Sequence, residues 1–170
     1  ILFYLKNHYW KLIIFFLLFE NENIDLKLSN SNSIVFPKRG AAIYTNKVRL
    51  LSKKSIVDPN VMVLTCKKLL DPIYFYYCLK YIGLYNLVEN AGIPQLNNKD
   101  LYPKKFITPP PDEQKKIGEI LTTLDLLIEK TLELGGIISK SKDKKEVQNY
   151  EKLKKGLMQK LLTGQIRVKI

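Results

Sequence analysis

The hydrophobic and polar positions of the chain follow two different patterns, and the change falls near residue 110. Before that point, short apolar runs separated by turn residues predict β-strands. Ile34-Val35-Phe36 is the clearest, a second β-like run covers residues 41–51, and residues 61–66 are typical of a buried strand. We also expect a last strand that leads to Thr108.

One helix is predicted within this region, over residues 71–90, followed by a loop at residues 91–100. Asp71 occupies a good N-cap position, Pro72 is well placed as the first helical residue, and aromatic residues follow at helical spacing. The strands, turns and helix together predict an α+β fold for a small mixed domain over residues 34–111.

Beyond Pro109-Pro110-Pro111 the pattern becomes helical. The last proline can begin a helix, and Asp112 and Glu113 then lie in its first turn, where the helix dipole favours anions. A broad apolar stripe suited to a coiled coil or bundle follows; it consists of Ile117, Ile120, Leu121, Leu124, Leu127, Ile128 and Leu134.

Two glycines, Gly135 and Gly136, are expected to break or bend this helix, because each costs about 1 kcal/mol in a helix interior. The polar residues 139–146 fit either a loop or a solvated helix. A second amphipathic segment ends near Gly164; its apolar or aromatic positions are Val147, Tyr150, Leu153, Leu157, Leu161 and Leu162. The sequence leaves open whether residues 112–162 form two helices or one of about 75 Å.

The first 33 residues fit neither region and stay unassigned. Their longest apolar run, residues 12–19, has eight residues, fewer than the roughly 20 that a membrane-spanning helix needs. The flanking Lys6 and Lys11 resemble a signal peptide, but no small-residue cleavage site follows. We expect a buried strand or helix here, with a membrane or export signal as the alternative.

The charge changes the picture more than the rest of the composition. The chain carries 28 Lys and Arg against 16 Asp and Glu, a formal charge of +12, although an AT-rich codon bias explains part of the lysine content. Residues 1–36 are neutral, residues 37–111 carry twelve cations and four acids, and residues 112–170 carry thirteen cations and nine acids. The excess in the middle favours a polyanionic partner, either nucleic acid or an acidic membrane surface.

Few residues could support catalysis or metal binding. The two cysteines, Cys66 and Cys78, form no close-spaced pair, which excludes a disulfide scaffold and fits a reducing cytoplasm. His8 is the single histidine, so His-based metal sites and nucleophile activation have little to use. We therefore expect no enzyme, no cofactor and no metal site.

Two short patterns resemble enzyme motifs. Residues 71–74, Asp-Pro-Ile-Tyr, resemble the motif of amino-methyltransferases, but helix capping at Asp71 explains them better. Asp100 with Glu113 and Lys115 matches a loose magnesium-nuclease spacing. Because three prolines separate these residues and the Glu falls at a helix start, we expect no nuclease chemistry.

A basic turn is the main candidate for nucleic-acid binding. Arg can contact guanine and Asn adenine in bidentate fashion, whereas Lys neutralises phosphates. The candidate residues in this turn are Lys38, Arg39, Tyr44, Thr45, Asn46, Lys47 and Arg49. A second polar set lies in a Gly-Pro loop and comprises Gln95, Asn97 and Asn98. A solvated hairpin and simple loop closure remain the alternatives for the two sets.

The helical segments also carry two longer motifs, PPPDEQKKIGEILTTLDLLIEKT and LKKGLMQKLLTGQIRV. They resemble the helical spacer of the specificity subunit of type I restriction-modification systems. Upstream, IVFPKRGAAIYTNKVRLL, VDPNVMVL and GIPQLNNKDL resemble a target recognition domain of that family. The resemblance covers residues 34–170, about half of such a subunit: a recognition domain at 34–111 and a spacer at 112–170.

This resemblance implies a non-catalytic protein that binds half of a bipartite site in double-stranded DNA. Its helices would set the distance between half-sites, dock methyltransferase subunits and, through the complex, restriction subunits; as half-subunits, two copies could self-associate. The implied helix-pairing and subunit-interface residues are Ile117, Leu121, Leu124, Ile128, Leu157 and Leu161. A peripheral membrane or coiled-coil interaction protein, with residues 1–19 inserted in lipid, is the alternative.

Overall fold

A computed structural model describes residues 28–88, 92–101, 104–138 and 142–169. Its elements are, in chain order, β1 (Leu28–Ser29), β2 (Ile34–Pro37), the 3₁₀-helix η1 (Gly40–Thr45), β3 (Arg49–Leu50), β4 (Ser55–Ile56), β5 (Val61–Leu64), α1 (Pro72–Ile82), the 3₁₀-helix η2 (Leu84–Leu87), α2 (Asn98–Leu101), α3 (Pro111–Ile138) and α4 (Lys142–Leu162). This content confirms the predicted α+β class. The expected strand, helix or membrane signal in residues 1–27 lies outside the described residues.

The chain forms two compact units, and each contains two separate stretches of sequence. We call the first the sheet unit; it comprises the described residues of 1–67 and 82–104. The second, the helical unit, comprises those of 68–81 and 105–170. The boundary at residue 111 between a recognition domain and a spacer is a functional division and stays a prediction.

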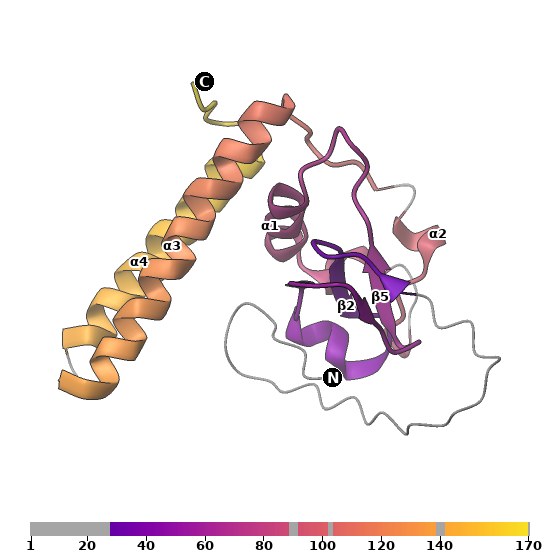
Figure 1. The fold of residues 1–170 in the computed structure, drawn as a ribbon, viewed down its shortest axis with the longest axis horizontal. Coiled ribbons are helices and arrows are strands. Elements are labelled where there is room, and N and C mark those ends of the chain that lie inside the picture. Colours follow the sequence, from indigo (N-terminus) through magenta and orange to yellow (C-terminus); the bar gives the residue numbers. More distant parts are fainter. Residues whose placement is uncertain (1–27, 89–91, 102–103, 139–141, 170) are drawn as a thin grey trace. The chain divides into compact units, whose positions relative to one another are not determined.

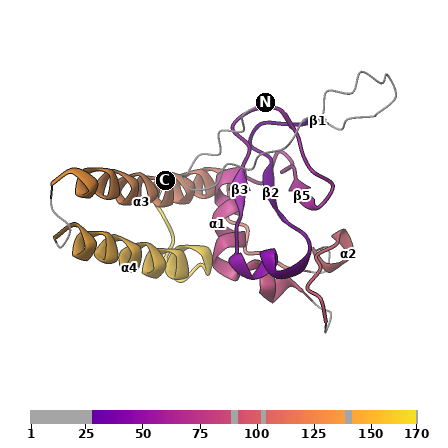
Figure 2. The ribbon, with the colours of Figure 1, turned by 90° about the horizontal axis from the view of Figure 1, so that it is seen from below.

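In the sheet unit, β2 is the central strand of an antiparallel sheet of order β3-β2-β5 (Figure 2). Val35 pairs with Arg49 on one side and with Val63 on the other. β1 pairs separately with β4. Apolar side chains from strands, 3₁₀-helices and loops close the core of this unit; they are Ile34, Phe36, Ile43, Val48, Leu84, Leu87 and Leu96.

The strand predicted at residues 41–51 is mostly wrong, because most of that stretch forms η1 and β3 covers two residues. Gly40 begins the turn with φ +69°, a left-handed conformation that favours glycine. Asn46 ends it, also left-handed at φ +47°, and its N–H donates to the carbonyl of Ile43. The two reversals leave Ile43 and Val48 buried without extended backbone between them.

Other boundaries differ from the sequence prediction in smaller ways. The strand predicted at 61–66 is present but stops at Leu64, and it is less buried than expected, since only Met62 is buried and the other three residues are half-buried. The loop at 91–100 contains the start of α2. The last strand leading to Thr108 is wrong: residues 104–110 form no strand, and the carbonyl of Ile107 accepts a hydrogen bond from the Tyr74 hydroxyl at 2.7 Å instead of pairing with another strand.

In the helical unit, α1 begins as the sequence predicts. The Asp71 carboxylate accepts a hydrogen bond from the N–H of Tyr74 at 2.8 Å, which satisfies a donor in the first turn. The helix ends at Ile82, earlier than the predicted residue 90, and Gly83 follows with φ +83°. Its buried side chains include Tyr74, Tyr77 and Leu79. Burial also raises the pKa of the Cys78 thiol to about 11, so this cysteine stays protonated at neutral pH.

Helices α3 and α4 lie side by side (Figures 1 and 2), so residues 112–162 form two helices and not one. The pairing is antiparallel, because Glu113 near the start of α3 contacts Arg167 beyond the end of α4, whereas Asp125 contacts Lys154. The break predicted at Gly135-Gly136 is wrong: α3 continues to Ile138. Packing of α3 on α4 outweighs the roughly 2 kcal/mol of helix propensity that two glycines cost.

A close contact joins α1 to α3 at Gly118. A Cβ added there would lie 3.1 Å from the Ile73 side chain and 3.5 Å from the Tyr74 backbone nitrogen. Nearby, the Tyr77 hydroxyl donates to the Asp125 carboxylate at 2.8 Å. The absence of a side chain at Gly118 therefore allows α1 to lie directly against α3.

The segment after α4 returns to the start of α3. Gly164 adopts φ +72° beyond the helix end, which confirms the predicted stop. The Arg167 guanidinium donates to both Glu113 carboxylate oxygens, with the shortest bond at 2.6 Å, and the Val168 N–H donates to the same carboxylate at 3.0 Å. These bonds, chiefly those from Arg167, hold the pKa of Glu113 below its usual range.

We expect this contact to be lost in acid. A carboxylate with a lowered pKa stabilises the fold above its unfolded pKa of about 4.3, and this contribution disappears as the pH falls through the folded pKa. Glu113→Gln should therefore lower the thermal midpoint at pH 7, and the difference from the unmodified chain should shrink as the pH falls below about 4.3. A difference that stays constant as the pH falls would show that the carboxylate charge is not involved.

Candidate nucleic-acid interface

The predicted basic turn forms η1 and the residues on each side of it. Arg39 is the N-cap residue of η1, and its side chain is exposed. Tyr44 and Thr45 lie at the exposed end of the same 3₁₀-helix, followed by half-buried Asn46 and Lys47. The sequence prediction thus describes one continuous surface segment, although it is a 3₁₀-helix and not a β-hairpin.

The structure brings the two predicted polar sets together. Arg39 forms an antiparallel β-bridge with Gln95, the Gly40 N–H donates to the Pro94 carbonyl at 2.8 Å, and the Leu96 N–H donates to the Lys38 carbonyl at 2.8 Å. These bonds fix the loop at 94–97 beside the start of η1. Residues more than fifty positions apart in the sequence therefore share one rim of the sheet unit, which we call the Arg39–Gln95 rim.

Several predicted contact residues also stabilise the local fold. The Asn46 side-chain oxygen accepts a hydrogen bond from the N–H of Leu84 at 3.0 Å, the Thr45 hydroxyl donates to the Ala42 carbonyl at 2.6 Å, and Arg49 donates to the carbonyl of Val48 at 2.9 Å. A side chain held in this way is positioned in advance but has fewer polar atoms left for a ligand. Arg39 and Tyr44 are the more accessible candidates.

The loop residues Gln95 and Asn97 are half-buried and contact each other. The Gln95 side-chain amide donates to Asn97 Oδ1 at 3.0 Å, and the Asn97 N–H donates to the Asp100 carboxylate at 2.7 Å. Asp100 is buried, which the sequence reasoning missed; its position three residues after Asn97 is the capping signal that marks it. Asn98 is exposed at the start of α2.

A second residue that the sequence reasoning missed is Tyr85. Its ring stacks on the ring of Tyr44, with centroids 4.7 Å apart and an interplanar angle of 30°. Both side chains are more than half exposed. Exposed aromatic residues interleaved with basic ones are typical of nucleic-acid surfaces, but no local pattern links position 85 to position 44.

The electrostatics of the sheet unit favour a polyanion. Its described residues include nine Lys or Arg but only two acids, Asp58 and Asp100. Asp100 is buried and bonded to backbone, and the Asp58 carboxylate accepts the N–H of Asn60 at 2.7 Å. Among the described residues of the sheet unit, the exposed charge is therefore mostly positive, which favours phosphate binding.

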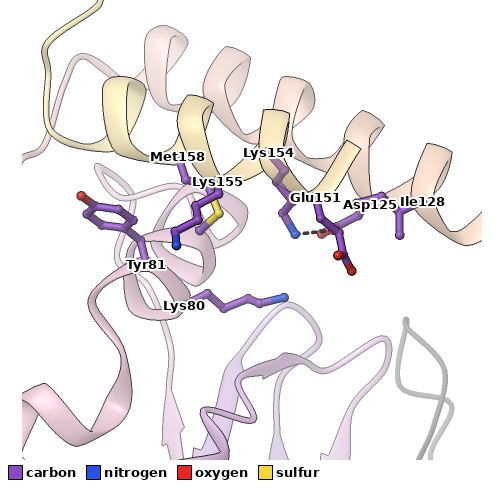
Figure 3. A pocket seen from close by; sticks show the side chains of 8 residues that line it. All are labelled: Lys80, Tyr81, Asp125, Ile128, Glu151, Lys154, Lys155 and Met158. Atoms are coloured by element: carbon purple, nitrogen blue, oxygen red, sulfur yellow. Dashed lines mark hydrogen bonds and ion pairs between the residues drawn. The ribbon is translucent and has the colours of Figure 1, made fainter. Parts of the chain in front are cut away.

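The helical unit holds a cavity of about 420 Å³ between the end of α1 and the facing sides of α3 and α4 (Figure 3). Its lining residues are Lys80, Tyr81, Asp125, Ile128, Glu151, Lys154, Lys155 and Met158. Figure 3 shows that the Lys154 ammonium points toward Asp125, with which it forms an ion pair. Acids and bases largely balance in this cavity, unlike the charge of the sheet unit.

The predicted helix-pairing residues lie on one stripe of the helical unit. Ile117, Leu121, Leu124 and Leu161 are buried, whereas Ile128 and Leu157 are half-buried. This stripe therefore already contributes to packing within the chain. Whether it also contacts another subunit stays a prediction.

The two enzyme-like patterns have structural explanations. Asp71 caps α1, Asp100 caps the turn at Asn97, and Glu113 binds Arg167. Among the described residues, no group of three or more His, Cys, Asp or Glu side chains is placed to hold a metal ion. Within the same residues, no helix is long and apolar enough to cross a membrane.

Comparison with known proteins identifies relatives of this chain. Three curated relatives come from Methanocaldococcus jannaschii. The type I restriction enzyme MjaVIII specificity subunit is 34% identical over 116 residues, which is 66% of this chain and 24% of that protein. The MjaIX specificity subunit is 26% identical over 146 residues, 84% of this chain and 31% of that protein. The putative MjaX specificity subunit is 37% identical over 105 residues, which is 61% of this chain and 22% of that protein.

The chain thus spans less than a third of the length of these curated relatives. Residues 17–135, more than half of the chain, match the family described as the type I restriction modification DNA specificity domain. The match begins upstream of residue 34, so it includes part of the segment that the sequence motifs left unassigned. The chain therefore belongs to the type I restriction-modification DNA specificity family, as its sequence motifs predicted.

Proposed function

We propose that this chain reads half of a bipartite site in double-stranded DNA as a non-catalytic part of a type I restriction-modification complex. The observation that carries the proposal is the Arg39–Gln95 rim, where the 3₁₀-helix η1, flanked by Lys38, Arg39 and Lys47, meets a polar loop on a unit whose described residues include one exposed acid, Asp58. The family supports it, since the matched domain is a DNA specificity domain. The protein would act in the cytoplasm, where DNA is present and the free cysteines stay reduced.

The helical unit is the proposed spacer and docking element. Its paired helices are tied together by the Tyr77–Asp125–Lys154 and Glu113–Arg167 contacts, and α3 alone spans about 42 Å at 1.5 Å per residue. In addition, several large apolar side chains are exposed on α3 and α4, namely Leu126, Leu127, Leu132 and Leu153. An element held together in this way, with exposed leucines, suits methyltransferase subunits, and through them restriction subunits, or a second copy of the chain.

Reconstitution with the methyltransferase subunit of the same system tests this proposal. We expect the two proteins to co-purify and the pair to methylate adenine at one defined sequence in a plasmid. Arg39→Ala in the same pair serves as a matched variant, because it should reduce methylation at the site without preventing co-purification. If the pair does not assemble and no site-specific methylation is found, the proposal is wrong.

The Arg39→Ala variant should lower sequence discrimination. Because an exposed Arg can bond a guanine edge in bidentate fashion, we expect a loss of about 1–3 kcal/mol between the target and an unrelated duplex. Competition binding at fixed salt measures this difference. Lys53→Ala, which removes an exposed cation elsewhere on the sheet unit, should weaken all duplexes alike. Equal weakening by Arg39→Ala would instead identify Arg39 as a phosphate contact.

A further inference from the structure

The Tyr44–Tyr85 pair is the largest exposed aromatic feature in the sheet unit's described residues. Tyr44 is 57% exposed and Tyr85 is 52% exposed, although each ring already covers one face of the other. Neither phenol oxygen has a hydrogen-bond partner among the described residues. Burying these side chains inside the unit would gain hydrophobic free energy, so the exposed arrangement calls for another explanation.

The two rings are held firmly in place. Tyr44 belongs to η1 and Tyr85 to η2, and the N–H of Leu84 donates to the Asn46 side chain at 3.0 Å, which ties the two 3₁₀-helices together. Leu84 and Ile43, adjacent in sequence to the two tyrosines, are fully buried. The pair is therefore a preorganised aromatic surface, which loses little conformational entropy when it binds a flat ligand.

The charge around the pair indicates the kind of ligand. Arg39 precedes η1 and Lys47 follows the residue that ends it, so cations stand at both ends of the segment that carries Tyr44. An aromatic face between cations fits a nucleobase whose neighbouring phosphates contact the cations. In a paired duplex the base faces are covered by stacking, so the ring pair can bind a base only where that base has left the helix.

We propose that Tyr44 and Tyr85 form a stacking site for an unstacked nucleobase in the bound DNA. This inference rests on the proposed function, which it deepens by adding Tyr85 and a preference for distorted DNA. The ring face supplies the interaction and the hydroxyl is not required. Stacking on an aromatic side chain is tolerant of base identity, so the site would favour DNA distortion without adding a base to the recognised sequence.

Binding to two DNA probes tests the inference with the full chain at low salt. One probe is a fully paired duplex, and the other is the same duplex with one extra unpaired adenine. We expect the unmodified chain to bind the bulged probe about 5- to 100-fold more tightly, as stacking of one base predicts. Tyr85→Ala and Tyr44→Ala should reduce this preference to about twofold or less, whereas Tyr85→Phe should keep it.

Two further variants control for folding and for general aromatic contacts. Tyr85→Leu keeps a large apolar side chain but removes the aromatic ring. It should therefore lose the preference for the bulged probe, and it tests the ring even if the alanine variants unfold. Tyr81→Ala removes a 39% exposed tyrosine from the helical unit and should change nothing. Equal binding of the two probes by the unmodified chain, or a Tyr85→Phe variant as weak as Tyr85→Ala, overturns the inference but not the proposed function. Failure to bind either probe overturns both.

Discussion

Asp125→Leu is expected to destabilise the helical unit by about 3 kcal/mol, although it replaces a largely buried charge with an apolar side chain. Asp125 accepts a hydrogen bond from the Tyr77 hydroxyl at 2.8 Å and forms an ion pair with Lys154. The Asp125 and Lys154 side chains are only 15% and 13% exposed. Removing the carboxylate leaves the ammonium without its partner in a poorly hydrated position, which accounts for the cost.

A double-mutant cycle separates this effect from lost packing. Because the penalty comes from the unpaired ammonium, Asp125→Leu combined with Lys154→Leu should regain most of the lost stability in urea unfolding. Glu119→Leu breaks the exposed Lys116–Glu119 pair on the same helix and should cost less than about 0.5 kcal/mol. If the two substitutions at 125 and 154 simply add, the ion pair is not the source of the effect.

This network also explains why the pairing of α3 with α4 has a defined register. Apolar contacts alone tolerate sliding by a helical turn, whereas the Tyr77–Asp125–Lys154 contacts join α1, α3 and α4 at one level. A buried polar group that is satisfied in only one alignment favours that alignment. The three helices thus form a unit in which the spacing between its ends is fixed.

The features that sequence reasoning predicted correctly depend on local chemistry. The cap at Asp71 and the helix start at Pro111 follow from groups within one turn of each other. By contrast, the strand expected at 41–51 failed because Asn46 adopts a left-handed conformation while its side chain bonds Leu84, thirty-eight residues later. Such a contact leaves no periodic signal in the sequence.

The candidate site divides in the same way. Residue types alone indicated Arg39 and Gln95 as nucleic-acid contacts, but their juxtaposition depends on a β-bridge between distant segments. Tyr85 was missed because it lies near the end of a run of aromatic residues whose spacing predicts a helix. In the structure that helix, α1, already ends at Ile82, and Tyr85 belongs to η2. Gly83, with its positive φ, starts the separate turn that places Tyr85 beside Tyr44.

Gln114→Leu should have a comparable or larger effect, because both polar atoms of the Gln114 side chain are hydrogen-bonded to backbone groups. It is fully buried. Its amide donates to the carbonyls of Leu69 at 3.0 Å and Pro109 at 2.7 Å, and its oxygen accepts the N–H of Asp71 at 2.8 Å. Leucine fills similar space but leaves three backbone groups without this hydrogen-bond partner. Each of them that stays buried without water as a replacement partner costs about 1–3 kcal/mol of stability. We expect a loss of about 3 kcal/mol in urea unfolding, against less than about 0.5 kcal/mol for Gln148→Leu on the exposed face of α4.

Gln114→Glu provides the sharper test, since its loss of stability should develop at higher pH than that of Glu113→Gln: above the unfolded carboxyl pKa of about 4.3 instead of below it. A carboxylate at this position would face two carbonyl oxygens, so its folded pKa should rise above the unfolded value of about 4.3. The variant should then be close to the unmodified chain in acid and lose stability progressively as the pH rises through that folded pKa. A pH-independent deficit would mean that Gln114 contributes shape and not hydrogen bonds. The expected profile would instead explain the Glu-Gln pair that opens the helix: Glu113 holds the chain's end through its charge, and Gln114 holds Leu69, Asp71 and Pro109 because it is neutral.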